Sequence, residues 1–229
     1  MDSAEVAVID YGVGNLLSVR RALEHCGVTV SVTANPEIIL AAPRVVLPGV
    51  GAFANAMGQL RRSGLDIVAQ EVAARGIPLL GICLGMQMLL DESEEFGINS
   101  GLGLIPGRVV PIPATAADGQ PHKIPHIGWN SLMLPTGRAS WIGSPLQDVN
   151  QGDAVYFLHS FMADPSDATD RLAECRYGGA LISAAIGRGR VFGCQFHPEK
   201  SGEIGLKVLR AFLASSIAAP VTQPHPATE

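Results

Sequence analysis

Short apolar runs alternate with amphipathic segments over the first third of the chain. The apolar runs are rich in aliphatic residues and predict buried strands, whereas the segments between them repeat apolar side chains at helical spacing. Alternation of strands and helices is typical of βαβ units, so we expect an α/β fold with a mostly parallel central sheet and helices on both faces. The predicted strands are 6–9, 28–32, 45–47 and 79–82, and the predicted helices are 16–25 and 65–75.

The pattern changes at about Gly103, where strand-like pieces are broken by proline and glycine. These pieces predict an antiparallel extension of the same sheet. Two polar, turn-rich segments, 114–122 and 136–153, are expected to be surface loops. A strand over 191–196 and a helix over 203–213 complete the predicted fold.

We expect one domain, residues 1–216, followed by a mobile tail, residues 217–229. The chain has 229 residues, of which 47% are hydrophobic and 16% charged, and this suits a single large core. A net charge of -5 without a basic run argues against a nucleic-acid partner. The acidic N-terminus does not fit a signal peptide, and no apolar run reaches the length of a membrane span. We therefore expect a soluble, cytoplasmic protein with no membrane contact.

The cysteines and histidines give no metal-binding pattern. His122 and His126 are four residues apart, but the proline before each of them argues against the helix that would bring them together as ligands. No CxxC pair or Cys/His cluster of zinc spacing is present, so we expect reduced thiols, no metal and no other cofactor. The cysteines are widely separated: Cys26, Cys83, Cys175 and Cys194.

The stretch PLLGICLGMQMLLDES, which starts at Pro78, places a cysteine at a strand-to-helix turn. Gly81 and Gly85 flank Cys83, and glycine permits the positive φ or the close backbone approach that a sharp turn needs. Such a turn lifts a nucleophile to the top of a sheet, and a helix N-terminus favours the thiolate. The alternative is a small buried cysteine that packs in the core.

Two glycine-rich loops are expected beside this turn, because ligands of open parallel sheets bind at the carboxyl ends of the strands. The loop 10–15 lacks the third glycine of a dinucleotide-binding motif, which favours a tight turn or a contact surface over phosphate binding. The loop 48–53 offers unencumbered backbone N–H groups. Those of Gly49 and Val50, together with the N–H of Leu84, predict an oxyanion hole.

The best candidate for a general base is His197, which follows an apolar strand in GCQFHPEKSG. Glu199 comes two residues later, and in extended chain residues i and i+2 face the same side, so the two side chains are expected to be neighbours. Pro198 between them restricts the backbone. A glutamate that holds one tautomer of a histidine suits a base that serves a distant nucleophile. A turn without a catalytic role is the alternative.

Together these motifs resemble the class I (triad) glutamine amidotransferases. The general resemblance rests on PGVGAF, GICLGMQ and CQFHPEKS. Four further features make the chain similar to the glutaminase subunits of imidazole glycerol phosphate synthase: DYGVGNLLSV, PHIGWN, YFLHSF, and Met86 where sister amidotransferases typically have histidine. The resemblance extends over roughly residues 5 to 215 and implies the flavodoxin-like amidotransferase fold.

The resemblance implies an enzyme that hydrolyses glutamine to glutamate and ammonia through a cysteine thioester. Cys83 would attack the amide carbon, His197 would accept the thiol proton and pass it to ammonia, and Glu199 would orient His197. The ammonia would pass to the heterodimer partner, a cyclase subunit that makes imidazole glycerol phosphate and aminoimidazole carboxamide ribotide in histidine biosynthesis. No cofactor is implied.

The resemblance also implies a glutamine pocket and a partner surface. Glu95 is expected to pair with the α-ammonium of glutamine, because an acid after a helix C-terminus is otherwise unfavourable; a solvated acidic loop is the alternative for this run. His159 is either a substrate ligand or a structural histidine. The implied pocket residues are Gly51, Gln87, Glu95, His159, Ser160 and Phe161, and the implied partner surface is Asn15, Trp129, Tyr156 and Lys200.

Three other functions fit parts of the pattern. The same chemistry in another synthase is the nearest, but Met86 and PHIGWN count against it. A docking module of the same fold would not need Cys83, His197 and Glu199. A cysteine hydrolase or chaperone-like relative would make Gln87 and the His-Pro-Glu motif coincidences.

Overall fold

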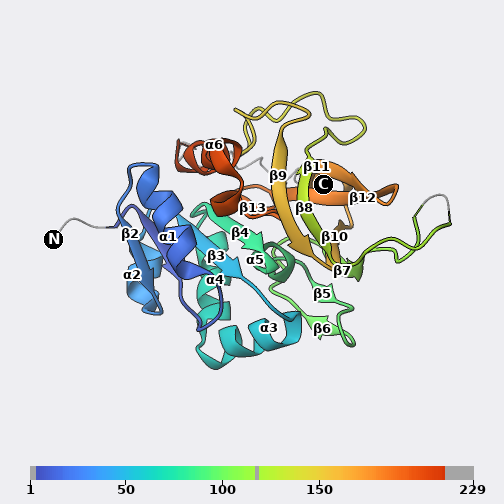
Figure 1. Cartoon of the computed structure of the whole chain (residues 1–229). Helices are drawn as coiled ribbons and strands as arrows, with labels where there is room; N and C mark the ends of the chain where they lie inside the picture. The colour runs from blue at the N-terminus through green and yellow to red at the C-terminus, as the bar shows by residue number, and fades with distance from the viewer. Residues whose placement is uncertain (1–3, 117–118, 215–229) are drawn as a thin grey trace, which may run out of the picture.

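Figure 1 shows the computed structural model, which describes residues 4–116 and 119–214. The predicted tail, 217–229, lies outside the described residues. In chain order the elements are β1 (Val6–Ile9), α1 (Leu16–His25), β2 (Val30–Thr33), α2 (Pro36–Ala41), β3 (Val45–Gly49), α3 (Phe53–Arg62), α4 (Leu65–Ala74), β4 (Leu79–Cys83), α5 (Leu84–Met88), β5 (Glu92–Ser93), β6 (Asn99–Ser100), β7 (Gly107–Pro111), β8 (His126–Ser131), β9 (Ala154–His159), β10 (Phe161–Pro165), η1 (Ala168–Asp170), β11 (Arg171–Tyr177), β12 (Ala180–Arg188), β13 (Val191–Cys194), η2 (Pro198–Lys200) and α6 (Gly202–Ala214).

The central sheet has seven strands in the order β11-β12-β13-β4-β3-β1-β2. The strands from β13 to β2 are parallel, which confirms the predicted mostly parallel sheet. β12 and β11 continue the sheet antiparallel to β13. Because β13, β4 and β3 are neighbours, their carboxyl ends bring together His197, Cys83 and the loop 48–53.

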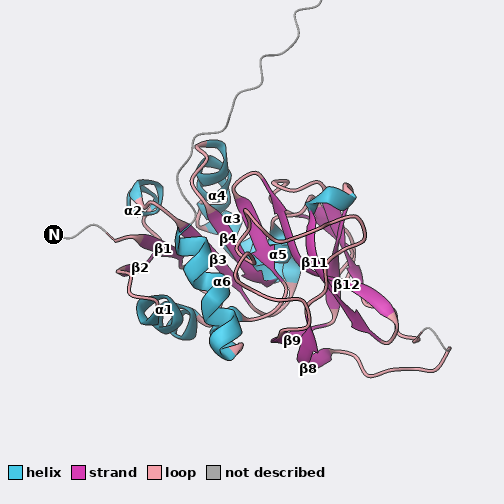
Figure 2. Ribbon diagram, turned by 90° about the horizontal axis from the view of Figure 1, so that it is seen from above, coloured by secondary structure: helices cyan, strands magenta, loops and turns pink. Residues whose placement is uncertain are grey.

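Helices cover both faces of this sheet, as Figure 2 shows from above. Side chains alternate along β1: Ala7 and Ile9 pack in the cluster that holds the buried residues of α2, α3 and α4, whereas Val6 and Val8 pack with those of α1 and α6. β1, β3 and β4 are buried on both faces, which explains their continuous aliphatic runs. No helix within residues 4–116 and 119–214 is long and apolar enough to cross a membrane.

The predicted antiparallel extension is correct for β11 and β12 and wrong for the other strand-like pieces after Gly103. β7 and β10 pair with each other, and β7 also pairs with β5, to give a separate sheet in the order β10-β7-β5-β6. β8 and β9 form a two-stranded antiparallel ribbon. The positions beside β13 are taken by β4 and β12, and β11 pairs with β12, so β7 to β10 lie outside the central sheet. Val109 of β7 and Ala163 of β10 join the core beside α5.

Two helices, α2 and α3, were not predicted. Asn35 caps α2 by accepting a hydrogen bond from the Glu37 N–H at 2.9 Å, and Pro36 occupies the first turn. α3 buries Phe53 and Met57 at helical spacing. Both signals are visible in the sequence. α3 begins directly after the loop that follows β3, so this loop is held at both ends.

The segment 136–153 is predicted to be a surface loop, but part of it is buried in the structure. Trp141 is buried and donates its indole Nε1–H to the Leu172 carbonyl at 2.7 Å, while Leu146 and Val149 join the same buried cluster. Its few large apolar side chains therefore anchor an otherwise polar segment on the core. The described parts of the segment 114–122, by contrast, project away from the body of the molecule (Figure 1).

Candidate active site

Cys83 ends β4 and directly precedes α5, at the predicted strand-to-helix turn. Its φ is 55° and its ψ is -112°, and it is one of two non-glycine residues with positive φ in the described ranges. Such strain is typical of a nucleophile elbow. The flanking glycines do not have positive φ; they are needed for close packing. A Cβ on Gly85 would overlap the Leu47 carbonyl oxygen, and a Cβ on Gly81 would lie 2.7 Å from the Gly85 backbone.

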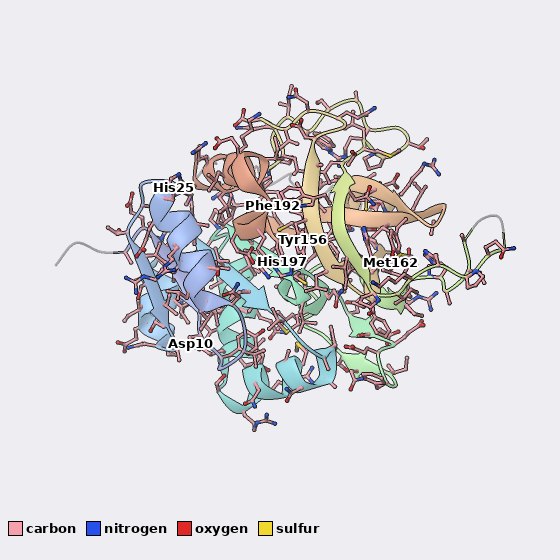
Figure 3. The ribbon with its side chains drawn as sticks, viewed as in Figure 1. Asp10, His25, Tyr156, Met162, Phe192 and His197 are labelled. Carbon is pink, nitrogen blue, oxygen red and sulfur yellow. The ribbon has the colours of Figure 1, made fainter. Side chains whose placement is uncertain are left out.

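His197 lies where β13 runs into η2, and Figure 3 shows it close to Tyr156 near the middle of the molecule. Its backbone N–H donates to the Tyr156 carbonyl at 2.9 Å, and Ser201 Oγ donates to the His197 carbonyl at 2.7 Å. His197 Nδ1 is 2.9 Å from Glu199 Oε1. The two side chains meet, as predicted, but through the 3-10 turn of η2 and not through extended chain.

This contact fixes the tautomer of His197. A carboxylate only accepts hydrogen bonds, so Nδ1 carries a proton and Nε2 is left for Cys83. Burial disfavours the imidazolium, but hydrogen bonds to Cys83 and Glu199 and the negative charge of both raise the pKa of His197 to about 9. An imidazolium beside a thiolate is the arrangement that activates a cysteine nucleophile.

A cavity of about 260 Å³ opens beside Cys83 and collects side chains from distant parts of the chain. Gly49 and Glu199 are absent from its lining, because Gly49 pairs with Cys83 at the end of β3 and Glu199 contacts the far ring nitrogen of His197. Pro125 and Leu158 line the cavity and were not predicted. The predicted residues that line it are Val50, Gly51, Cys83, Leu84, Gln87, Glu95, His159, Ser160, Phe161, His197 and Lys200.

Two polar side chains of the cavity are held by other parts of the protein. Glu95 Oε2 accepts a hydrogen bond from the Phe53 N–H at 2.6 Å, at the start of α3. Gln87 Nε2 donates to the Phe161 carbonyl at 3.0 Å and to Gln195 Oε1 at 2.9 Å. These hydrogen bonds fix the side chains of Glu95 and Gln87 before any ligand binds. The contacts of these two side chains with a substrate stay predictions.

The ribbon of β8 and β9 presents an apolar face at the mouth of the cavity. Ile127 pairs with Leu158, and Trp129 pairs with Tyr156, so the four side chains share one face. Trp129 is 59% exposed and Leu158 is 40% exposed, although Leu158 also lines the cavity. Exposed apolar patches of this kind mark interaction sites. Asn15 precedes α1 without a side-chain capping bond, and its predicted role at a partner surface stays a prediction.

His159 is one member of a buried histidine pair that the sequence did not predict. Its Nδ1 is 2.8 Å from the Phe161 carbonyl, which only accepts, so Nδ1 carries the proton. His159 Nε2 must then accept from His126 Nδ1, at 3.0 Å, and His126 Nε2 accepts from Asn130 Nδ2, at 3.3 Å. Burial lowers the pKa of His126 to about 4 and that of His159 to about 3. Both rings are therefore neutral at pH 7, and the chain of bonds holds the pocket segment from His159 to Phe161.

The histidine pair predicts a loss of stability in mild acid. Both groups bind a proton more weakly in the folded protein than at the ordinary pKa of 6.5, so their contribution is fully present above pH 6.5 and is lost as the pH falls toward 4. We expect each histidine to add roughly 1 kcal/mol per pH unit to the decline of the unfolding free energy in this range. Urea unfolding at several pH values measures the slope.

The matched control for this slope is a histidine on the surface. The variant His126→Gln should lower the slope of the unfolding free energy with pH by up to the contribution of one titrating group, roughly 1 kcal/mol per pH unit. The variant His25→Gln, at an exposed position at the end of α1, should not change this slope. Equal slopes for His126→Gln and the parent protein would show that the pair does not resist protonation.

Three residues that contact the predicted site were missed. Gln195 lies two positions before His197 in the stretch that directly follows β13, and residues at that spacing face the same side of an extended chain, which is a usable sequence signal. Tyr11 donates its hydroxyl to the Pro48 carbonyl at 2.9 Å and so joins the loops 10–15 and 48–53. Burial and the charge of Cys83 raise the pKa of Tyr11. His126 gave no local signal, because its partner is 33 residues away.

The described residues contain no group of three or more His, Cys, Asp or Glu side chains arranged to hold a metal ion.

Comparison with known proteins gives one consistent family. Residues 7–215 match the family described as glutamine amidotransferase class-I. The chain is 50% identical over 210 residues to the imidazole glycerol phosphate synthase subunit HisH 1 of Legionella pneumophila (strain Lens), covering 92% of this chain and 99% of that protein. It is 47% identical over 208 residues to the subunit HisH of Geobacillus sp. (strain WCH70), covering 90% and 95%.

Solved structures agree in fold. A crystal structure of a glutamine amidotransferase superimposes with a TM-score of 0.67 at 18% identity, over 91% of this chain and 97% of that one. The structure of PurLQS from Thermotoga maritima gives a TM-score of 0.65 at 20% identity, over 92% and 98%. Both support the α/β architecture described above.

Proposed function

The chain belongs to the class-I glutamine amidotransferase family, and from its similarity to the HisH subunits we propose that it is the glutaminase subunit of an imidazole glycerol phosphate synthase. Its activity is the hydrolysis of glutamine to glutamate and ammonia, with the ammonia used in histidine biosynthesis. The observation that carries the proposal is the cysteine at the elbow: Cys83 shares a cavity with His197, whose other ring nitrogen is bound by Glu199.

The reaction uses these three side chains in sequence. Cys83 Sγ attacks the side-chain amide carbon of glutamine, and His197 holds the thiol proton and passes it to the departing ammonia. The glutamyl group remains on Sγ as a thioester. Water then attacks the thioester carbon, with His197 as base, and glutamate leaves. Glu199 keeps His197 in the tautomer that leaves Nε2 for the sulfur.

The negative oxygen of each tetrahedral intermediate needs donors. We assign this role to the backbone N–H groups of Gly49, Val50 and Leu84, which lie at the end of β3 and at the start of α5. Glu95 at the cavity is assigned to the α-ammonium group of glutamine, since a carboxylate attracts that charge. Gly51, Gln87 and the segment from His159 to Phe161 complete the proposed pocket.

The proposed partner is a cyclase subunit that forms a heterodimer with this chain. The Legionella and Geobacillus relatives are named as subunits of a synthase, which implies such a partner for them. The apolar ribbon face, with Trp129 and Tyr156, is suited to docking because aromatic side chains make strong contacts at interfaces. Lys200 lines the cavity and is proposed to face the partner. A cytoplasmic location stays a prediction.

The experiment that tests this function measures glutamate release from glutamine. The purified chain is assayed alone, with the cyclase subunit, and with the cyclase and its ribotide ligand, and a Cys83→Ala preparation serves as the blank. Release that requires the cyclase and Cys83 is the expected result. Release stimulated only by another synthase would keep the chemistry and reject the pathway. No Cys83-dependent release under any condition would leave a docking module.

A further inference from the structure

Gln195 is fully buried beside the reactive sulfur. It directly follows β13, and its Nε2 lies 3.7 Å from Cys83 Sγ, within hydrogen-bond range for sulfur. Two further groups form hydrogen bonds with the sulfur: His197, and the Leu158 carbonyl at 3.8 Å, which is an alternative acceptor for the thiol proton. The titratable side chains of Tyr11 and Cys194 also lie close enough to interact with the charge of Cys83. Gln195 therefore donates a hydrogen bond to this sulfur from an uncharged amide group.

The orientation of the Gln195 amide follows from its neighbours. Gln87 Nε2 contacts the Phe161 carbonyl at 3.0 Å, and a carbonyl only accepts, so the amide nitrogen of Gln87 is placed without ambiguity. The same nitrogen is 2.9 Å from Gln195, which must therefore offer its Oε1 there. Gln195 Nε2 is left to face Cys83.

We propose that Gln195 is a further catalytic residue, whose side-chain N–H donates to the Cys83 thiolate and favours that form. The inference rests on the proposed function and deepens it. A donor binds an anionic acceptor more strongly than a neutral one, and burial strengthens the difference. The donor stabilises the thiolate before attack; as the carbon–sulfur bond forms, the sulfur loses its charge and the N–H···S bond weakens.

The test is the pH dependence of Cys83 alkylation by iodoacetamide, which reacts with the thiolate and needs no glutamine. The background variant is Cys26→Ser, because Cys26 is partly exposed. In Gln195→Met, which removes the donor and keeps similar bulk, the alkylation midpoint should rise by about one pH unit. The rate below the midpoint should fall roughly threefold, because the thiolate fraction falls about tenfold while the more basic thiolate reacts about three times faster. In Gln195→Glu the midpoint should rise further, because the added carboxylate oxygen faces the sulfur.

A control variant separates a donor effect at the sulfur from the loss of a side-chain amide hydrogen bond elsewhere in the protein. Gln70 on α4 donates its Nε2 to the Leu102 carbonyl at 3.0 Å, so Gln70→Met removes a comparable bond without touching the sulfur. Its alkylation midpoint should equal that of the parent. A folded Gln195→Met variant with the parent midpoint would overturn the proposal. If that variant does not fold, an unchanged or lower midpoint in Gln195→Glu would overturn it.

The two proposals fail in different ways. Absence of glutamate release with every partner rejects the glutaminase function, while the alkylation midpoints still report on Gln195. In the active complex we expect Gln195→Met to lower kcat roughly threefold and leave KM for glutamine unchanged, because a smaller fraction of Cys83 is thiolate and the donor contacts the sulfur and not the substrate. A change in KM alone would assign Gln195 to the pocket and overturn its role at the thiolate.

Discussion

Replacement of Cys83 by alanine should lower glutamate release by roughly 10⁴-fold or more in the complex with the cyclase subunit. Without the sulfur no thioester forms, and the only remaining route is direct attack of water on an amide. Removal of a nucleophile costs about as much as removal of a whole triad, because the other two groups have nothing to activate. Glutamate release under saturating glutamine measures the effect.

The control for Cys83→Ala is the same substitution at Cys26, the partly exposed thiol that follows α1. Cys26→Ala should retain the parent rate, and both variants should show the parent circular dichroism spectrum. A Cys83→Ala protein that still released glutamate at more than about 1% of the parent rate would exclude a covalent mechanism. The Cys83 side chain is 7% exposed but small, so its truncation to alanine should lower the unfolding free energy less than truncation of a large core side chain would.

Much of the central fold could be predicted because its signals are local. The helix 16–25 was predicted with the bounds that the structure gives, and the strand before Cys83 ends within one residue of its prediction. A buried parallel strand is a continuous aliphatic run, so it is visible without knowledge of its neighbours. The elbow was predictable for the same reason, since a cysteine between two glycines at a strand end needs no distant partner.

The features that could not be predicted depend on distant partners. No periodicity shows that β7 and β10 pair with each other instead of joining the central sheet, because the choice depends on which strand edges are already occupied. The contact of Gln195 with Cys83 joins residues 112 positions apart. The histidine pair joins β8 to the end of β9. Gln195 and His126 lie within the motifs CQFHPEKS and PHIGWN, but a motif does not show which distant side chain each residue contacts.

Close backbone packing also explains how the elbow is kept strained. α5 is pressed against β3 at Gly85, where a Cβ would overlap the Leu47 carbonyl oxygen and lie 2.9 Å from its carbon. The same strand continues into Gly49 and the proposed oxyanion loop. Because the obstacle is backbone within a buried sheet, neither side has room to move.

Gly85→Ala should therefore destabilise the protein by about 3 kcal/mol and also lower glutamate release strongly, because the added methyl group pushes α5 away from β3. The matched control is Gly58→Ala on α3, where the Cβ would meet only the flexible end of Arg62 at 3.3 Å. That variant should gain about 0.5–1 kcal/mol, as alanine replaces glycine inside a helix. Urea unfolding and the glutaminase assay measure both. If Gly85→Ala were as stable and active as Gly58→Ala, the elbow would not depend on contact with β3.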